Sequence, residues 1–221
     1  MTRKQIGVAS GCLAVLLATG LAIQSVDSGQ ARHEVALPTD FAGLTRGAEA
    51  QDLTTLRTEC EQQNAGHHVP WHTQVQGYGQ PGATGLRESD LVAAAVDTEG
   101  SVPDAARAAT EMLGGYSPDG SSLEDGTPVN GMQTYPPGPL KGAPACATVG
   151  ESGQEYDVCA WADGNTTGNL SDLAGRLTRE QLVDRTRELR APTEQPEQPE
   201  QPGRPVRPAT STRRCSAGVG R

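Results

Sequence analysis

The sequence predicts an α+β protein, with a small antiparallel sheet and helices packed on one face, flanked by an N-terminal apolar helix and a disordered Pro-rich tail. Three observations predict this class. Periodic segments in the middle of the chain follow the order α-ββα-βββα, which fits helices covering an antiparallel sheet. An uncharged apolar run precedes them, and a Glu-Gln-Pro repeat follows them. We therefore divide the chain into an apolar segment (1–30), a stalk (31–36), a folded domain (37–191) and a tail (192–221).

Composition limits the folded part to one modest domain. The 221 residues include only seven aromatic side chains, namely one Phe, two Trp and four Tyr, whereas Gly and Pro number 27 and 16. The formal net charge is −9, and residues 31–191 carry 23 acidic side chains against 11 basic ones. Because an acidic surface repels phosphate, we expect no nucleic-acid partner.

Residues 6–23 form an uncharged apolar run directly after Arg3 and Lys4. As a helix this run is about 27 Å long, close to the hydrocarbon thickness of a bilayer. The basic pair favours the cytoplasmic side, so the rest of the chain lies outside. Two interpretations stay open, a cleaved signal peptide and an uncleaved membrane anchor. We expect a protein that faces outside from the cell membrane or is secreted.

The sequence of the first half of the domain predicts one helix and two strands. Leu53 and Leu56 recur at helical spacing within residues 48–63, which contain neither Pro nor Gly. Residues 69–78 alternate in polarity and predict a strand. Residues 90–96 form a short apolar run, which is typical of a buried strand.

A second helix is predicted to begin at residues 101–104, with Ser101 or Asp104 as its cap, and to stop at Gly114. Residues 114–145 are rich in Gly, Pro, Ser and Asp and predict a long loop.

Strands and a turn are predicted from Cys146 to Leu170, followed by a last helix that ends before Pro192. Thr178 and Gln181 have the spacing of a capping box, which marks the start of that helix. From Pro192 onward, Pro at every third position favours polyproline II without a core.

The positions of Cys146 and Cys159 predict a disulfide. A hairpin turn centred on Ser152 and Gly153 places Val149 opposite Tyr156 and the two cysteines opposite each other. Side chains at such cross-strand positions are close enough for a disulfide, and export supplies the oxidising compartment that it needs.

His67, His68 and His72 are the candidate metal ligands. In an extended segment His68 and His72 point one way and His67 the other, whereas zinc takes three or four converging ligands. We therefore expect exposed histidines, no metal and no cofactor. The sequence contains no nucleophile elbow, phosphate loop or zinc-protease helix motif, so no residue is assigned as catalytic.

Several motifs are similar to those of one bacterial group. Pro-Gly-Pro-Leu at 137–140, Cys146, Cys-Ala-Trp-Ala-Asp at 159–163 and Thr-Gly at 167–168 resemble the C-terminal part of actinobacterial membrane-anchored or secreted proteins of unknown function. The resemblance implies an exported domain behind one membrane segment and implies no activity. Here Asn169-Leu170 replaces the apolar strand expected after Thr-Gly, which puts that strand in doubt.

The function expected from the sequence is thus binding or structure in the cell envelope rather than catalysis. Its partners are the membrane, if the apolar segment stays uncleaved, and a component of the envelope; no particular protein partner is indicated. The alternative is a secreted metal-binding or hydrolytic module that uses His67, His68 and His72.

Overall fold

The computed structural model describes residues 33–64, 71–98, 104–114, 126–138, 142–150 and 155–196, together with residues 102, 122 and 140. An eight-stranded sheet forms its centre, in the order β2-β3-β4-β5-β9-β8-β7-β6, and every neighbouring pair is antiparallel. The strands are β2 (Asp40–Phe41), β3 (Leu44–Arg46), β4 (Trp71–Gly79), β5 (Ser89–Thr98), β6 (Val129–Thr134), β7 (Ala143–Val149), β8 (Tyr156–Ala162) and β9 (Thr166–Asp172). The α+β class and the antiparallel sheet are confirmed.

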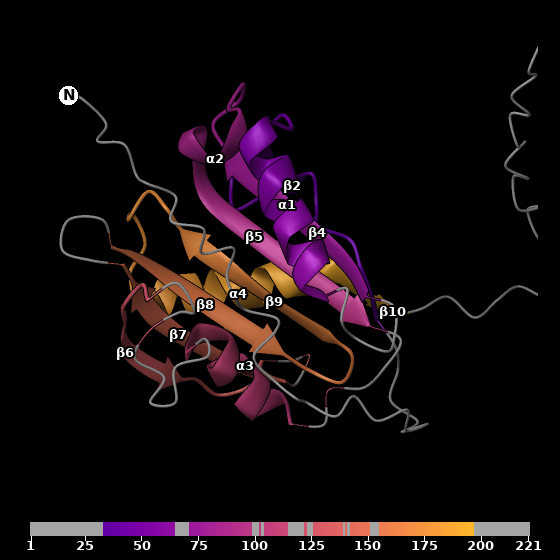
Figure 1. Ribbon diagram of the computed structural model, residues 1–221, viewed down its shortest axis with the longest axis vertical. Coiled ribbons are helices and arrows are strands. Elements are labelled where there is room, and N and C mark those ends of the chain that lie inside the picture. Colours follow the sequence, from indigo (N-terminus) through magenta and orange to yellow (C-terminus); the bar gives the residue numbers. More distant parts are fainter. Residues whose placement is uncertain are drawn as a thin grey trace, which may run out of the picture.

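Helices cover both faces of this sheet, so the prediction that they pack on one face is wrong (Figure 1). The helices are α1 (Gln51–Asn64), α2 (Gly85–Glu88), α3 (Ala105–Gly114) and α4 (Arg179–Thr193). In Figure 1, α1 and α3 lie in front of the sheet and α4 lies behind it. The apolar run of β5 sends alternate side chains to opposite faces, and both faces therefore need an apolar cover.

The strand register defines the two faces. On the α1/α3 face, Asn169 pairs with Ala94 on one side and with Ala160 on the other. On the α4 face, Leu170 pairs in the same way with Ala93 and Cys159. Each face has its own buried apolar side chains, so the sheet separates two layers of core.

The α4 face holds one hydrophobic cluster, in which Leu182, Val183 and Leu189 of α4 pack with Trp161 and Leu170. The α1/α3 face holds two separate clusters. The α1 cluster joins Leu53, Leu56 and Cys60 to Val75, Leu86, Val92 and Ala94. The α3 cluster joins the helix residues Ala108, Ala109, Met112 and Leu113 to Val96 and to small side chains of β7 and β8.

Local capping bonds confirm two predicted helix starts. Asp104 Oδ1 accepts a hydrogen bond from the Arg107 N–H at 2.9 Å, so Asp104 caps α3. At α4 the Thr178 N–H donates to Gln181 Oε1 at 2.8 Å, and the Gln181 N–H donates to Thr178 Oγ1 at 3.3 Å. This reciprocal pair is the capping box that the spacing predicts.

The described structure differs from the predicted segments in several places, and β2, β3 and α2 are not predicted at all. Strand β6 lies inside the predicted 114–145 loop. Helix α4 continues through Pro192 to Thr193, and β10 (Glu194–Pro196) then pairs with β1 (His33–Val35). The described structure thus includes part of the predicted stalk and the first residues of the predicted tail. Pairing between the two chain ends leaves no local signal in the sequence.

Three polar side chains hold residues 35–38, the end of β1 and the segment after it, against the α4 face. Asp97 Oδ2 accepts from the Val35 N–H at 2.8 Å, and Gln74 Oε1 accepts from the Leu37 N–H at 3.0 Å. The Tyr78 hydroxyl donates to the Pro38 carbonyl at 2.9 Å, and burial raises the pKa of Tyr78.

The apolar run at residues 6–23 lies outside the described residues. No helix in the described part of the chain has the length and apolar character needed to cross a membrane.

Candidate functional site

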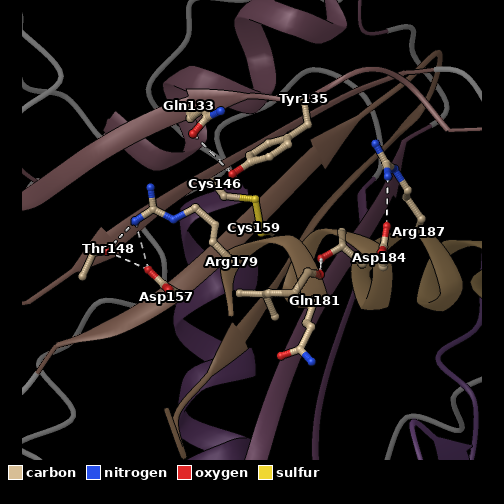
Figure 2. The surroundings of a disulfide bond; sticks show 12 residues. Gln133, Tyr135, Cys146, Thr148, Asp157, Cys159, Arg179, Gln181, Asp184 and Arg187 are labelled. Atoms are coloured by element: carbon tan, nitrogen blue, oxygen red, sulfur yellow. Dashed lines mark hydrogen bonds and ion pairs between the residues drawn. A yellow bond between two sulfur atoms is a disulfide. The ribbon is translucent and has the colours of Figure 1, made fainter. Parts of the chain in front are cut away.

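A disulfide joins Cys146 of β7 to Cys159 of β8 (Figure 2). The two residues are direct cross-strand partners with their Cα atoms 4.0 Å apart, and Val149 pairs with Tyr156 in the same register. The predicted disulfide is therefore confirmed. Both cysteines are completely buried in the cluster under α4, so the bond braces the sheet and is not presented to a substrate.

Arg179, at the start of α4, connects this helix to the strands beside the disulfide (Figure 2). Its Nη2 donates to Thr148 Oγ1 at 2.6 Å and lies 3.2 Å from Asp157 Oδ1, while Nη1 donates to the Gly131 carbonyl at 2.6 Å. One guanidinium thus contacts β6, β7 and β8. The contacts fix α4 over the disulfide, which is a structural role.

His72 is the one predicted metal ligand that the described residues include. Its Nδ1 lies 2.7 Å from Asp97 Oδ1, and its side chain is 68% exposed while that of Asp97 is 9% exposed. His67 and His68 lie outside the described residues, so their convergence with His72 stays a prediction. Within the described residues no group of three His, Cys, Asp or Glu side chains has a metal-binding arrangement.

Asp163 organises the turn between β8 and β9. Its Oδ1 accepts from the Thr166 N–H at 3.0 Å and from Thr166 Oγ1 at 2.9 Å, while its Oδ2 accepts from Arg190 Nη2 at 2.9 Å. The Arg190 and Asp163 side chains are only 2% and 7% exposed. This buried ion pair ties the end of α4 to the turn, and removing either partner alone would leave a buried charge.

The least expected feature lies on the α1/α3 face of β9. Thr167, Asn169 and Ser171 point to this face, and they are 6%, 1% and 2% exposed. Four of their side-chain atoms are buried without a hydrogen-bond partner: Thr167 Oγ1, Asn169 Oδ1, Asn169 Nδ2 and Ser171 Oγ. We call these three residues the polar row. Successive members are about 7 Å apart along the strand.

The polar row runs between the two helices of its face. Helix α1 packs mainly on β4, and α3 packs on β7 and β8, so β5 and β9 lie between them. Every residue that pairs with the row across the sheet is Ala or Val: Val92, Ala94 and Val96 of β5, and Val158, Ala160 and Ala162 of β8. The row therefore separates the α1 cluster from the α3 cluster with a line of neutral donors and acceptors.

Such a row opposes folding. An unpaired buried polar group costs about 1–3 kcal/mol, and Asn is disfavoured in strands even when it is solvated. Other buried side-chain atoms without partners in the described chain are single atoms on separate elements, namely Glu111 Oε2, Trp161 Nε1 and Arg187 Nε. Among the residues that the structure describes, only β9 has three successive residues of one face that share this property. A costly local arrangement in a central strand points to a functional site.

The sequence carried one signal for this site. The Asn169-Leu170 pair breaks the apolar pattern and puts the strand in doubt, yet β9 is present and all seven of its residues are buried. What the sequence could not show is that the polar side of β9 faces inward between two helices. That placement depends on strand order, with β9 between β5 and β8.

The fold and these contacts define an α+β domain that has a disulfide-braced antiparallel sheet and a buried polar row. No protein-family model, curated protein or solved structure matches the chain.

Proposed function

We propose that this chain is an exported, cell-envelope-associated domain, of the kind found in the actinobacterial group that its sequence resembles, and that it binds a ligand and does not catalyse a reaction. The observation that supports export is the Cys146–Cys159 disulfide inside the sheet. Disulfides of this kind persist in oxidising compartments and are rare in the cytosol. The basic pair and apolar run at the N-terminus support the same location.

Binding is supported by the chemistry of the buried polar groups. The polar row offers one amide and two hydroxyls, none of which ionises near neutral pH. Acid–base and nucleophilic catalysis need a titratable group placed against a nucleophile or a substrate. Donors and acceptors that are neutral and already buried suit recognition of a ligand instead.

Fractionation of cells tests the location. The full chain with a C-terminal tag is expressed in an actinobacterial host, free thiols are alkylated before lysis, and peptides are mapped without reduction. We expect the protein in the envelope or the medium, with Cys146 and Cys159 recovered as one disulfide-linked peptide.

The mass of the recovered N-terminus distinguishes a cleaved signal peptide from an anchor. A variant without residues 6–23 is the control, expected in the cytoplasm with both thiols alkylated. A full chain found in the cytoplasm with reduced cysteines contradicts the proposal.

A second candidate function is a metal-binding or hydrolytic module around His72. It is favoured by one observation, the Asp97 carboxylate against Nδ1 of an exposed imidazole, which leaves Nε2 directed away from this partner. Carboxylates commonly orient metal-binding histidines in this way. Calorimetric titration with zinc tests it, with Asp97→Asn and His72→Ala as variants. Heat no different from buffer for the unmodified chain rejects this candidate.

A further inference from the structure

We propose that the polar row is the floor of a ligand site for an uncharged molecule with an apolar body and one amide or hydroxyl group. The inference rests on the proposed binding function and names its site and ligand class. It is carried by four buried side-chain atoms without partners on Thr167, Asn169 and Ser171. A bound ligand would supply the hydrogen bonds that the protein itself does not.

The neutrality of the ligand follows from what surrounds the row. All six cross-strand neighbours are Ala or Val, and none can neutralise a charge. An ionised ligand group placed there would lose its hydration without gaining a counter-ion, which is strongly unfavourable. A primary amide or a hydroxyl avoids that penalty.

The amide or hydroxyl follows from the donors and acceptors of the row. Asn169 presents an acceptor at Oδ1 and two donor hydrogens at Nδ2, so a second amide can pair with it through two bonds. Thr167 and Ser171 each offer a hydroxyl that donates and accepts. Asn169 is the central residue, with one hydroxyl about 7 Å away on each side along the strand.

The apolar body follows from the clusters on either side. A molecule lying over the row meets the α1 cluster, which includes Leu53 and Leu56, and the α3 cluster, which includes Ala108 and Met112. Burial of apolar ligand surface against these side chains supplies the main driving force, and the row sets orientation.

Access to the row requires a movement, because its unpartnered atoms are closed to solvent. The two helices of this face belong to separate clusters. One helix can therefore shift outward while the other cluster stays packed, and the layer under α4 is on the opposite side of the sheet. The disulfide lies in that opposite layer, so it does not tie α1 or α3 to the sheet.

Four probes of one chain length test the inference with the full exported chain. Decanamide and decyl alcohol are uncharged, whereas decanoate and decylammonium carry a charge on a similar body. Binding is measured by calorimetry below the aggregation concentration of each probe. The side-chain amide resonances of asparagine are followed in a two-dimensional proton–nitrogen NMR spectrum and assigned with Asn169→Ala. Exposed Asn130 on β6 supplies the matched control variant, Asn130→Ala.

We expect decanamide and decyl alcohol to bind, to shift the Asn169 amide resonances and to bind roughly tenfold or more weakly to Asn169→Ala. Asn130→Ala should bind as the unmodified chain does, and the charged probes should bind at least tenfold more weakly than the neutral ones. If Asn169→Ala does not fold, Asn169→Leu takes its place with the same expected loss, because it keeps a similar shape and removes the amide.

Three results overturn the inference. The neutral probes do not bind, they bind without shifting the Asn169 resonances, or the row variants bind them with unchanged affinity. In each of these cases the row is a buried polar defect or holds only water. The location experiment is independent of these probes, so an exported chain whose row binds nothing removes this site and keeps the proposed export.

Discussion

Thr166 and Thr167 are adjacent buried residues of β9, but only one of their hydroxyls has a hydrogen-bond partner. Thr166 Oγ1 donates to the Asp163 carboxylate at 2.9 Å, whereas Thr167 Oγ1 has no partner. We expect Thr167→Val to raise the free energy of unfolding by about 1 kcal/mol, because Val keeps the shape and removes an unpaired hydroxyl. Thr166→Val should lower it by about 2 kcal/mol, because a bond to a charged group is lost. Urea denaturation measures both variants.

An increase in the free energy of unfolding of Thr167→Val would also bear on the proposed ligand site. Functional residues are often kept at a cost in stability. A variant that is more stable and binds decanamide less tightly would show that cost at one residue. A loss of stability in Thr167→Val would instead mean that its hydroxyl has a partner in solution, which contradicts the unpaired arrangement.

Residue 168 is glycine because the indole of Trp161, its cross-strand partner, occupies the space of a side chain on the α4 face. A Cβ at this position would meet the Trp161 ring and would lie 2.6 Å from the Ala94 carbonyl oxygen. We expect Gly168→Ala to lower the free energy of unfolding by about 3 kcal/mol, the upper part of the range for overpacked sites. Near-ultraviolet circular dichroism should also change, because Trp161 must move.

Gly43→Ala is the matched control for this prediction. Gly43 has a positive φ of 76° but open space around its Cα, so its substitution introduces backbone strain without a clash. We expect a loss of about 1 kcal/mol and an unchanged near-ultraviolet spectrum. Equal losses in the two variants would show that the contact with Trp161 does not decide the choice of glycine.

At the scale of elements, the β7–β8 hairpin depends on its disulfide. The bond closes a separation of 13 residues, for which loop entropy predicts about 3 kcal/mol. We expect Cys146→Ala combined with Cys159→Ala to lower the free energy of unfolding by about that amount. Cys60→Ala is the control, because Cys60 is buried but free, and it should cost only about 1 kcal/mol. A double variant no less stable than Cys60→Ala would argue against a stabilising disulfide.

Elements whose signals are local were predictable from the sequence. The hairpin register of Cys146 and Cys159 follows from the turn between them, and the start of α4 follows from Thr178 and Gln181. Strand β6 was missed because Gly131, Gln133 and Thr134 offer little apolar alternation, and its side chains are mostly exposed at the sheet edge. A strand with so few buried residues cannot be predicted from its own sequence and becomes evident only from its pairing with β7.

The candidate site was predictable only in part, for a related reason. The sequence of β9 shows polar and small residues, and nothing in it says which side of the strand is covered. Whether Asn169 faces water or the interior is decided by β5 and β8, which bring Ala94 and Ala160 beside it. The side of the sheet taken by α4 is likewise set by the whole chain path and not by the helix.

At the scale of the whole molecule, the two ends of the described chain meet. Strand β1 pairs with β10, with Val35 opposite Glu194, and the Ala36 N–H donates to the Thr193 carbonyl at 2.9 Å. His33 and Pro196, the first and last residues that the structure describes, are therefore direct cross-strand partners.

Because β1 and β10 pair with each other, the stability losses caused by truncating the two ends should not be additive. A chain that ends after Thr193 loses β10, and a chain that begins at Leu37 loses β1 together with buried Val35. We expect each truncation to lower the free energy of unfolding by about 2 kcal/mol through lost pairing and apolar burial. The two together should cost little more than the N-terminal truncation alone, because both remove the same strand pair.

The control for this cycle is a chain that ends after Pro196 and so keeps β10. Urea denaturation of this control, the two single truncations and the double truncation gives the coupling between the ends. The control should be as stable as the full chain in the same measurement. Strictly additive losses would mean that each end packs on the sheet independently through contacts such as Asp97 with Val35, and that the β1–β10 pair contributes nothing of its own.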